Sequence, residues 1–410
     1  MPGLGEMKIL QINTVGNYGS TGRIAEQVGR EVISRGHISY IACARKIRES
    51  ASQIIKIGSL PGVCFNGLWQ RIFDSDSPYA KFATKALIKK IESISPDIVH
   101  LHNTHGYYLH NKTLLDFLAK YGKPVVWTLH DCWVLTGHCA YFDIAGCKKW
   151  KTHCRNCPQK RAYPASLFWD NSYSNYQAKQ DCILAMENLT FVPVSNWLKG
   201  LVEQSPLASK KSIVINNGID TDTFKPEHDK PACMKNGKKN VLFVASVWGR
   251  TKGYNFVPEI AKKLGIGYQC TLVGANDKQL KELSGLGINA IKRTESASEL
   301  AAYYSGADVF ANPTMQEALS MVNMEAISCG TPVVCFNSGG VCETIPSDEV
   351  GKIVERGNVD AAVEQIKNFA ESGKARIGQI CRETAVLKFD KKFAWGKYLD
   401  LYAELNGEKF

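Results

Sequence analysis

Two glutamates and a helix start lie close together in the stretch Ala311 to Gly340, ANPTMQEALSMVNMEAISCGTPVVCFNSGG. Glu317 precedes Ser320, a good helix N-cap residue, and the helical run Met321 to Cys329 contains Glu325. A helix N-terminus at the edge of a parallel sheet is a ready anion site. Because two carboxylates would repel phosphate unless they bind neutral hydroxyl groups, the combination predicts a nucleotide-sugar rather than a bare nucleotide.

Two cations follow an apolar strand that we predict over Val241 to Val247. The next loop, WGRTKG, carries Arg250 and Lys252. Arginine offers a bidentate fork and lysine a point charge, which together suit a diphosphate. Two basic residues on a loop are usually solvated surface, but a place at the same sheet edge as the Ser320 helix favours binding. Cations fixed there stabilise a diphosphate that gains negative charge as a glycosidic bond breaks.

Polar residues also follow two apolar strands in the first half of the chain. His102 and His105 come after one strand, and His130 and Asp131 come after the next. In open α/β sheets, ligands bind outside the carboxyl ends of the strands. A structural role is the commoner outcome for any single histidine here, whereas for the His130-Asp131 pair we favour function.

A glycine-containing loop, TVGNYGSTG from Thr14 to Gly22, follows the first predicted strand. We expect a helix from there to about Arg35. The setting suits phosphate or sugar binding by backbone amides. The glycines do not fit G-x-G-x-x-G, so a plain tight turn explains the loop equally well.

A cysteine-rich segment spans residues 132–157, CWVLTGHCAYFDIAGCKKWKTHCRNC. In a cytosolic protein such a cluster binds metal more often than it forms disulfides. Its last four cysteines could give a closed, purely structural zinc site, with His138 and His153 as spare ligands: Cys139, Cys147, Cys154 and Cys157. The spacing is not that of a standard finger, so zinc and free thiols are weighed evenly.

The order of apolar runs and helical patterns predicts an α/β protein with two doubly wound domains facing across a cleft. We predict a first domain at residues 1–217, on the acceptor side, and a nucleotide-sugar domain at residues 218–388. A C-terminal helix at residues 389–410 is expected to pack back on the first domain. Residues Asn217 to Pro226 have the turn composition of a hinge.

The composition of the chain restricts the kinds of partner that it can bind. The chain has 410 residues and a formal net charge of +11, which points to an anionic partner such as nucleotide phosphates, a membrane surface or nucleic acid. We see no apolar run long enough to span a membrane and no signal peptide, so we expect a soluble cytoplasmic protein. Residues Met1 to Glu6 look like an extension. The basic amphipathic stretch Gly67 to Ile94 suits either an ordinary surface helix, which we slightly prefer, or peripheral membrane contact.

The motifs around the two glutamates resemble the nucleotide-sugar signature of glycosyltransferase family four. Seven residues separate Glu317 from Glu325, and AISCGTPVV and a Gly-Gly pair follow. The resemblance extends over nearly the whole chain, through GSTG near the start, His130-Asp131, NGID and Lys252-Gly253. The family's members are retaining enzymes of the GT-B fold. The cysteine-rich segment is similar to that of a bacterial subset that builds capsule, exopolysaccharide or lipopolysaccharide O-antigen.

The resemblance implies roles for individual residues. Glu317 would hold hydroxyls of the donor sugar, Glu325 the ribose hydroxyls, and Lys252 with Arg250 the diphosphate. His130 would lie near the donor sugar and Gly19 would line the cleft. The backbone amides of three residues would meet the diphosphate: Leu319, Ser320 and Met321. Catalysis in the family proceeds by front-face substitution without a catalytic metal, so zinc here would be structural.

Two features depart from the family pattern. Only Thr251 separates Arg250 from Lys252, where the family places its arginine several residues earlier, and Ala318 and Ser320 replace glycines. Arg293 and Thr294 could neighbour the base. The sequence does not identify the base, the sugar or the acceptor, which could be a saccharide or lipid-linked.

Two other functions compete with a glycosyltransferase. A nucleotide-sugar epimerase of the same fold is one, because fold does not fix function. A basic, zinc-containing nucleic-acid-binding protein is the other. It explains the charge and the Cys-x-x-Cys motif, but it leaves Glu317 and Glu325 without a role and lacks a recognisable reading element.

Overall fold

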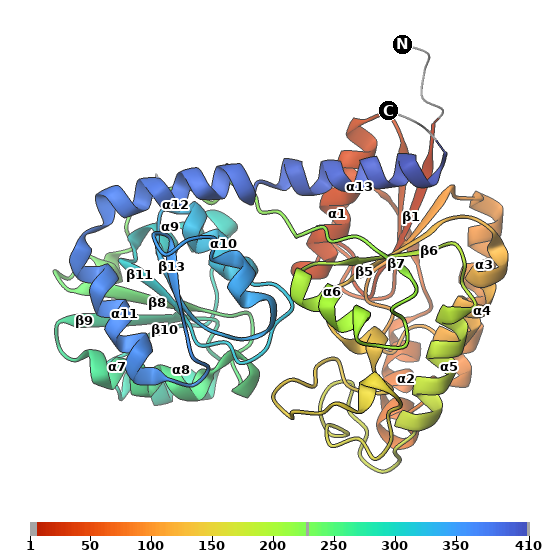
Figure 1. Cartoon of the computed structure of the whole chain (residues 1–410), viewed down its shortest axis with the longest axis horizontal. Helices are drawn as coiled ribbons and strands as arrows, with labels where there is room; N and C mark the ends of the chain where they lie inside the picture. Colours follow the sequence, from red (N-terminus) through yellow and green to blue (C-terminus); the bar gives the residue numbers. More distant parts are fainter. Residues whose placement is uncertain (1–5, 227–228, 408–410) are drawn as a thin grey trace. The chain divides into compact units, whose positions relative to one another are not determined.

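The chain consists of two units, each built around one parallel sheet. A computed structural model describes residues 6–226 and 229–407 (Figure 1). Unit 1 comprises Met1–Asn216 and Trp395–Phe410, and unit 2 comprises Asn217–Ala394. The extension predicted at residues 1–6 lies outside the described residues except for Glu6.

The sheet of unit 1 has seven strands in the order β3-β2-β1-β4-β5-β6-β7, and every neighbouring pair is parallel. The strands are β1 (Lys8–Ile12), β2 (Ile38–Cys43), β3 (Gln53–Lys56), β4 (Ile98–Leu101), β5 (Val125–Leu129), β6 (Leu189–Pro193) and β7 (Lys211–Ser212). All residues of β4, β5 and β6 are buried, as expected for central strands that helices cover on both faces.

Helices cover both faces of this sheet (Figure 1). Those of unit 1 are α1 (Gly19–Ser34), α2 (Leu60–Phe73), α3 (Pro78–Ile94), α4 (Asn111–Tyr121), α5 (Ser172–Leu184) and α6 (Asn196–Glu203). Helix α1 begins at Gly19, so the predicted loop is shorter than expected, because Gly19–Gly22 forms the first helical turn. Ser195 accepts a hydrogen bond from the Leu198 amide and caps α6.

The basic stretch at residues 67–94 is two helices rather than one. Asp74 ends α2 in the left-handed conformation, with a φ of 49°. The Ser77 side chain then accepts a hydrogen bond from the Ala80 amide, and Pro78 occupies the first turn of α3. These are the expected stop and start signals for helices. The interruption divides the exposed basic residues of α3 from the apolar residues of α2.

The sheet of unit 2 has six parallel strands in the order β10-β9-β8-β11-β12-β13. They are β8 (Lys239–Val244), β9 (Tyr268–Val273), β10 (Asn289–Ile291), β11 (Val309–Asn312), β12 (Val333–Phe336) and β13 (Gly351–Val354). Strand β8 ends three residues before the predicted end at Val247. Ser246 and Val247 are exposed and belong to the loop that carries the two predicted cations.

Helices flank both faces of this second sheet as well (Figure 1). They are α7 (Val257–Leu264), α8 (Asp277–Ser284), α9 (Ala297–Gly306), α10 (Met321–Ser328), α11 (Val359–Ser372) and α12 (Lys374–Lys388). Buried apolar residues of β8, β11 and β12 pack with those of α7 and α11 in one core. Both units are therefore Rossmann-like layers of helix, sheet and helix.

The last helix, α13 (Lys391–Leu405), starts in unit 2 and continues into unit 1. Tyr402 and Tyr398 on this helix are fully buried. The Tyr402 hydroxyl lies 2.6 Å from Nδ1 of His100, and the Tyr398 hydroxyl lies 2.9 Å from Oγ1 of Thr128. These bonds attach α13 to strands β4 and β5. Within the described residues, no helix has the length and apolar character needed to cross a bilayer.

Strand order reverses once in each unit. In unit 1 the reversal lies between β1 and β4, and in unit 2 it lies between β8 and β11. A sheet opens a crevice at such a switch point, outside the carboxyl ends of the two strands. A ligand site is therefore expected among the residues that follow β1 and β4 in unit 1, and among those that follow β8 and β11 in unit 2.

Candidate active site

In unit 2, the loops that follow β8 and β11 lie against each other. The amide of Met315 donates a hydrogen bond of 2.9 Å to the carbonyl of Thr251. Gly253 has a φ of 72°, and a Cβ atom there would lie 1.9 Å from the carbonyl oxygen of Pro313. Only glycine permits this approach. The close contact brings the cation-bearing loop beside the loop that carries Glu317.

Lys252 and Glu317 form an ion pair across these loops, with 2.6 Å between Nζ and Oε1. Their side chains are 27% and 20% exposed. The second carboxylate oxygen of Glu317, Oε2, is buried and has no hydrogen-bond partner among the described residues. A buried carboxylate oxygen without a donor is costly. This atom is therefore well suited to accept a hydrogen bond from a ligand hydroxyl.

The main chain of Glu317 is fixed from the other side by the Gly339-Gly340 turn. The Gly340 amide donates a hydrogen bond of 2.9 Å to the Glu317 carbonyl. A Cβ atom on Gly339, which has a φ of 55°, would lie 2.3 Å from that same oxygen. The Gly-Gly pair in the sequence motif thus holds the Glu317 loop by close backbone contact.

Helix α10 begins directly after Ser320, as predicted, but the Ser320 side chain does not cap it. Its Oγ instead accepts a hydrogen bond of 3.0 Å from Nδ2 of Asn312, and Asn312 also donates to Asn323 at 2.7 Å. The prediction of a serine cap was wrong because this buried amide network competes for the hydroxyl. Leu319 and Ser320 are buried and Met321 is half-buried at this helix start.

Glu325 lies one helical turn into α10. Its Oε2 accepts a hydrogen bond of 3.0 Å from the hydroxyl of Tyr304, a fully buried residue of α9. The side chain is half-buried, so the tyrosine fixes its position while part of it faces solvent. A carboxylate held in this way can accept hydrogen bonds from further hydroxyls.

Three of the residues predicted for the site in unit 2 form no side-chain hydrogen bond or ion pair with Lys252, Glu317 or Glu325 within the described residues. Arg250 is exposed, and the described part of the chain shows no ion pair or hydrogen bond from its side chain. Arg293 is also exposed and Thr294 is half-buried. Both follow β10, the edge strand, which β9 separates from β8. The structure therefore joins Lys252 with Glu317 and leaves the other cation apart.

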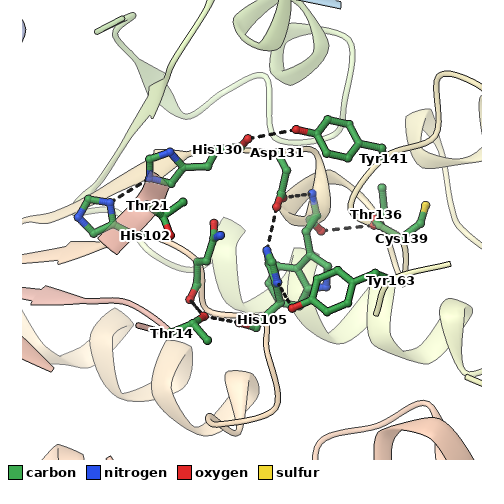
Figure 2. A network of polar contacts seen from close by, with 12 residues as sticks. Thr14, Thr21, His102, His105, His130, Asp131, Thr136, Cys139, Tyr141 and Tyr163 are labelled. Carbon is green, nitrogen blue, oxygen red and sulfur yellow. Dashed lines mark hydrogen bonds and ion pairs between the residues drawn. The ribbon is translucent and has the colours of Figure 1, made fainter. Parts of the chain in front are cut away.

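In unit 1, His130 belongs to a chain of hydrogen bonds that begins in the core (Figure 2). Gln11 donates its amide hydrogen to the Ala25 carbonyl at 2.8 Å, so its Oε1 is an acceptor and lies 3.0 Å from Nε2 of His102. His102 must then be protonated at Nε2, and its Nδ1 accepts from Nε2 of His130 at 3.0 Å. The remaining Nδ1 atom of His130 is thereby left as a hydrogen-bond acceptor.

These imidazoles are neutral near pH 7. Burial lowers the pKa of His130 to about 4, and it lowers the pKa of His100 to about 3. The pKa of His102 is lowered well below its usual value by burial and by the neighbouring histidines. The sequence analysis placed His102 at a strand end with a structural role as the commoner outcome, and the structure shows that it fixes the tautomer of His130. Its position at the end of an apolar strand was the signal in the sequence.

A second pair, His105 and Asp131, lies beside this chain (Figure 2). Nε2 of His105 is 2.8 Å from Oδ2 of Asp131, and Nδ1 is 3.2 Å from the Tyr163 hydroxyl. Burial acts to raise the pKa of Asp131, but His105, the Trp133 amide and His130 together outweigh it, and the net pKa is lowered. Asp131 also accepts the Trp133 amide at 2.9 Å. The sequence offered no signal for Tyr163.

The remaining predicted residues of unit 1 fall at two other places. Gly19 is exposed at the start of α1, with a φ of 64° and no atom within 4 Å of a hypothetical Cβ. Side-chain bulk there would meet nothing in its own unit. The four cysteines of the predicted zinc site line one small pocket in the irregular connection between β5 and α5.

Comparison with known proteins identifies the class of this two-unit α/β protein. The family model "Glycosyltransferase Family 4" matches residues 21–223, and "Glycosyl transferases group 1" matches residues 226–382. The chain therefore belongs to glycosyltransferase family 4 and is a glycosyltransferase with the GT-B fold. Neither an epimerase nor a nucleic-acid-binding protein is favoured by these matches.

Individual relatives support the same assignment. An Escherichia coli K12 protein assigned to colanic acid biosynthesis as a glycosyl transferase, WcaC, is 25% identical over 401 residues, covering 94% of this chain and 95% of its own. The capsular polysaccharide biosynthesis glycosyltransferase CapM of Staphylococcus aureus is 25% identical over 229 residues, covering 52% of this chain and 60% of CapM. The structure of Anabaena HepE with UDP-glucose matches with a TM-score of 0.66 at 15% identity, over 97% of this chain and 100% of HepE.

Proposed function

We propose that this protein is a retaining glycosyltransferase that moves a sugar from a nucleotide-sugar donor to a saccharide acceptor in the synthesis of a bacterial surface polysaccharide. One observation carries the proposal. Glu317 is paired with Lys252 through one oxygen, while its buried second oxygen has no partner among the described residues. The pair offers a cation for a diphosphate and an acceptor for a sugar hydroxyl at the switch point of unit 2.

The proposed reaction needs no covalent intermediate. The bond between the anomeric carbon and the diphosphate oxygen breaks, and the acceptor hydroxyl forms its new bond on the same face of the sugar. The acceptor proton passes to the departing diphosphate oxygen. Lys252 stabilises the charge that develops there, which lowers the barrier because the charge is larger in the transition state than in the ground state.

We assign the other donor contacts by the same reasoning. The amides of Leu319, Ser320 and Met321 face the diphosphate at the start of α10, where a helix dipole favours an anion by about 0.3–1 kcal/mol. Glu325 accepts the ribose hydroxyls. His130, neutral and with Nδ1 as an acceptor, binds a hydroxyl of the transferred sugar. Relatives with a UDP-glucose complex and with polysaccharide roles support a UDP-sugar as the first donor to test.

A pocket in unit 1 supports the binding of a polar acceptor. It is a small hollow of about 100 Å³ that opens to solvent. Its lining combines aromatic rings with hydrogen-bonding groups, a mixture that suits saccharides; it includes His105, Tyr107, Asn111, Trp133 and Asn175.

The test is an assay with purified protein and a panel of UDP-, GDP- and TDP-sugars. Thermal shift identifies the donor, because a ligand at one hundred times its dissociation constant stabilises the folded state by about 2.7 kcal/mol. Product analysis by NMR with an oligosaccharide acceptor then reports the anomeric configuration. An inverted anomer would refute retention, and a rearranged donor sugar without transfer would indicate an epimerase.

We further propose that unit 1 binds an anionic membrane surface. Helix α3 exposes Phe82 at 77%, next to exposed lysines: Lys81, Lys85, Lys89 and Lys90. The exposed loop residues Leu167 and Trp169 lie along α2, since their amides donate to the carbonyls of Arg71 and Ile72 at 2.7 and 3.2 Å. Exposed aromatic residues beside lysines are typical of interfacial binding.

Vesicle sedimentation tests this surface. Binding to vesicles that contain phosphatidylglycerol should weaken in high salt and in the triple variant Lys85→Gln, Lys89→Gln, Lys90→Gln. The matched control neutralises three exposed lysines of unit 2, at Lys235, Lys238 and Lys278. If the two triple variants bind vesicles equally weakly, the loss of binding is due to net charge alone and the proposed surface is wrong. If neither variant binds more weakly than the wild type, the proposed surface is also wrong.

A further inference from the structure

The connection between β5 and α5 contains little regular structure. Only two short 3₁₀ helices, η1 (Trp133–Leu135) and η2 (Lys149–Lys151), occur in it. Connections this long without strands or long helices are uncommon inside a compact domain and usually have a function of their own. This feature is not explained by sugar transfer.

Four cysteines of this connection line one pocket: Cys139, Cys147, Cys154 and Cys157. The pocket is very small, with a cavity volume of about 10 Å³. That space suits a single ion rather than an organic molecule. The thiols of Cys139 and Cys157 are within hydrogen-bonding reach of each other. Cys154 and Cys157 lie three residues apart in one stretch, whereas Cys139 and Cys147 come from two others, so a common ligand would join three segments of the connection.

A histidine with an unused nitrogen lines the same pocket. His138 is 3% exposed, and its Nδ1 lies 2.6 Å from Oδ1 of the buried Asp74. Its Nε2 atom is buried and has no hydrogen-bond partner among the described residues. Because a carboxylate often orients a histidine that binds metal through its other ring nitrogen, His138 competes with the cysteines as a ligand, and its substitution distinguishes the two. The pairing also fixes the main chain beside Cys139, because Asp74 belongs to the end of α2.

Other contacts hold the turns around the pocket. Nζ of Lys149 donates to the carbonyls of Arg155 and Asn156 at 2.9 Å each, and Asp170 accepts the Cys157 amide at 2.6 Å. The ring of Phe142 stacks on Trp150 with 4.7 Å between centroids. As positioned, no three His, Cys, Asp or Glu side chains of the described residues form a complete ligand set. The thiols must therefore turn toward the pocket centre to bind an ion.

We propose that Cys139, Cys147, Cys154 and Cys157 bind one zinc ion that cross-links this connection. The four thiols release their protons to solvent and bind Zn²⁺ as thiolates, and no redox change takes place. Four protein ligands close a tetrahedral site and leave no position for substrate, so the ion is structural. His138 then lies in the wall of the site rather than on the metal.

Metal content tests the proposal. We expect protein purified without added metal to contain about one zinc per chain by inductively coupled plasma mass spectrometry. Cys154→Ser and Cys157→Ser should each lose most of it, whereas Cys64→Ser, at an exposed cysteine of α2, should keep it. A zinc content near zero in the wild type, or a disulfide within the cluster by intact mass, would overturn the proposal.

Cobalt replacement identifies the ligands. A four-thiolate Co²⁺ site gives intense thiolate-to-metal absorption and strong tetrahedral bands. His138→Ala should leave this spectrum unchanged, and a changed spectrum would make His138 a ligand and refute the four-cysteine assignment. Circular dichroism and thermal unfolding report whether each variant is folded.

The structural role has its own readout. Removal of zinc by a chelator should speed trypsin cleavage at Lys148, Lys149, Lys151 or Arg155 by at least tenfold, while cleavage in unit 2 stays unchanged. If cleavage of the connection is equal with and without the metal, the ion does not cross-link it and the proposal fails.

Discussion

The two switch points differ in how they use charge. In unit 2, the loops after β8 and β11 present an ion pair of Lys252 and Glu317 that is about one quarter exposed. In unit 1, His102 follows the switch-point strand β4 and His130 follows its neighbour β5, and both are buried or half-buried and neutral. The two sheets have the same order in their first six strands, yet charged groups follow the strands of unit 2 and neutral groups follow those of unit 1.

Under the proposed function, the two units would divide the work of one reaction. A fixed cation is useful where a leaving group gains charge. Neutral imidazoles are useful where hydroxyl groups must be oriented without a net charge nearby. Unit 2 has an unsatisfied acceptor on Glu317, whereas unit 1 has an acceptor on His130 whose tautomer is set by Gln11 and His102.

The largest effect should follow from breaking the ion pair of unit 2. Glu317→Gln and Lys252→Ala should each lower kcat about 10²- to 10³-fold, because each removes a group aimed at the reacting centre. Steady-state kinetics with the identified donor measure this. Glu325→Gln is the matched control, since it should raise the KM for the donor more than it lowers kcat. Near-normal kcat in both Glu317→Gln and Lys252→Ala would contradict the assignment.

A smaller effect is expected when the neutral end of unit 1 is altered. His130→Ala removes the Nδ1 acceptor and should lower kcat/KM about 10- to 100-fold. His102→Asn leaves His130 in place but no longer fixes its tautomer, so this variant should lower kcat/KM about tenfold. The two variants combined should cost no more than His130→Ala alone, because both act through one atom. Additive losses would show that His102 has a separate role.

The sequence predicted the site where strand ends determine position, and it failed where side chains compete. Glu317 and Lys252 could be placed together because carboxyl ends of neighbouring parallel strands share an edge. Ser320 was predicted as a cap, but Asn312, eight residues earlier, takes its hydroxyl. Tyr163, which contacts His105, comes from an irregular connection whose path has no periodic signal. Local pattern specifies the strands and helices, while the partners of buried polar groups depend on packing.

The neutral histidines also predict a pH dependence. The pKa of His100 is about 3 in the folded protein because of burial, against an ordinary value of 6.5. Between those values the unfolded chain binds a proton that the folded chain does not, so stability falls as the pH drops. From pH 7 to pH 5, His100 alone should cost about 2 kcal/mol.

Hydrogen–deuterium exchange of peptides from β4, β5 and α13 measures this loss within unit 1. His100→Gln keeps a polar side chain between Tyr402 and Thr128 but cannot titrate. The variant should therefore lose less protection than the wild type between pH 7 and pH 5. Equal losses in the two proteins would mean that His100 is not the group responsible.

The smallest effect separates the two cations of unit 2. Arg250 is exposed, and its side chain has no hydrogen bond or ion pair within the described residues, whereas Lys252 is held by Glu317. An exposed, unrestrained cation adds little, since solvent screens it and ordering it costs entropy. Arg250→Ala should lower kcat/KM less than tenfold, and high salt should reduce the difference further. A loss as large as that of Lys252→Ala would show that Arg250 reaches the diphosphate once the donor is bound. Both cations would then form the clamp that the sequence predicted, and the order of the two residues in the loop would matter less than their reach.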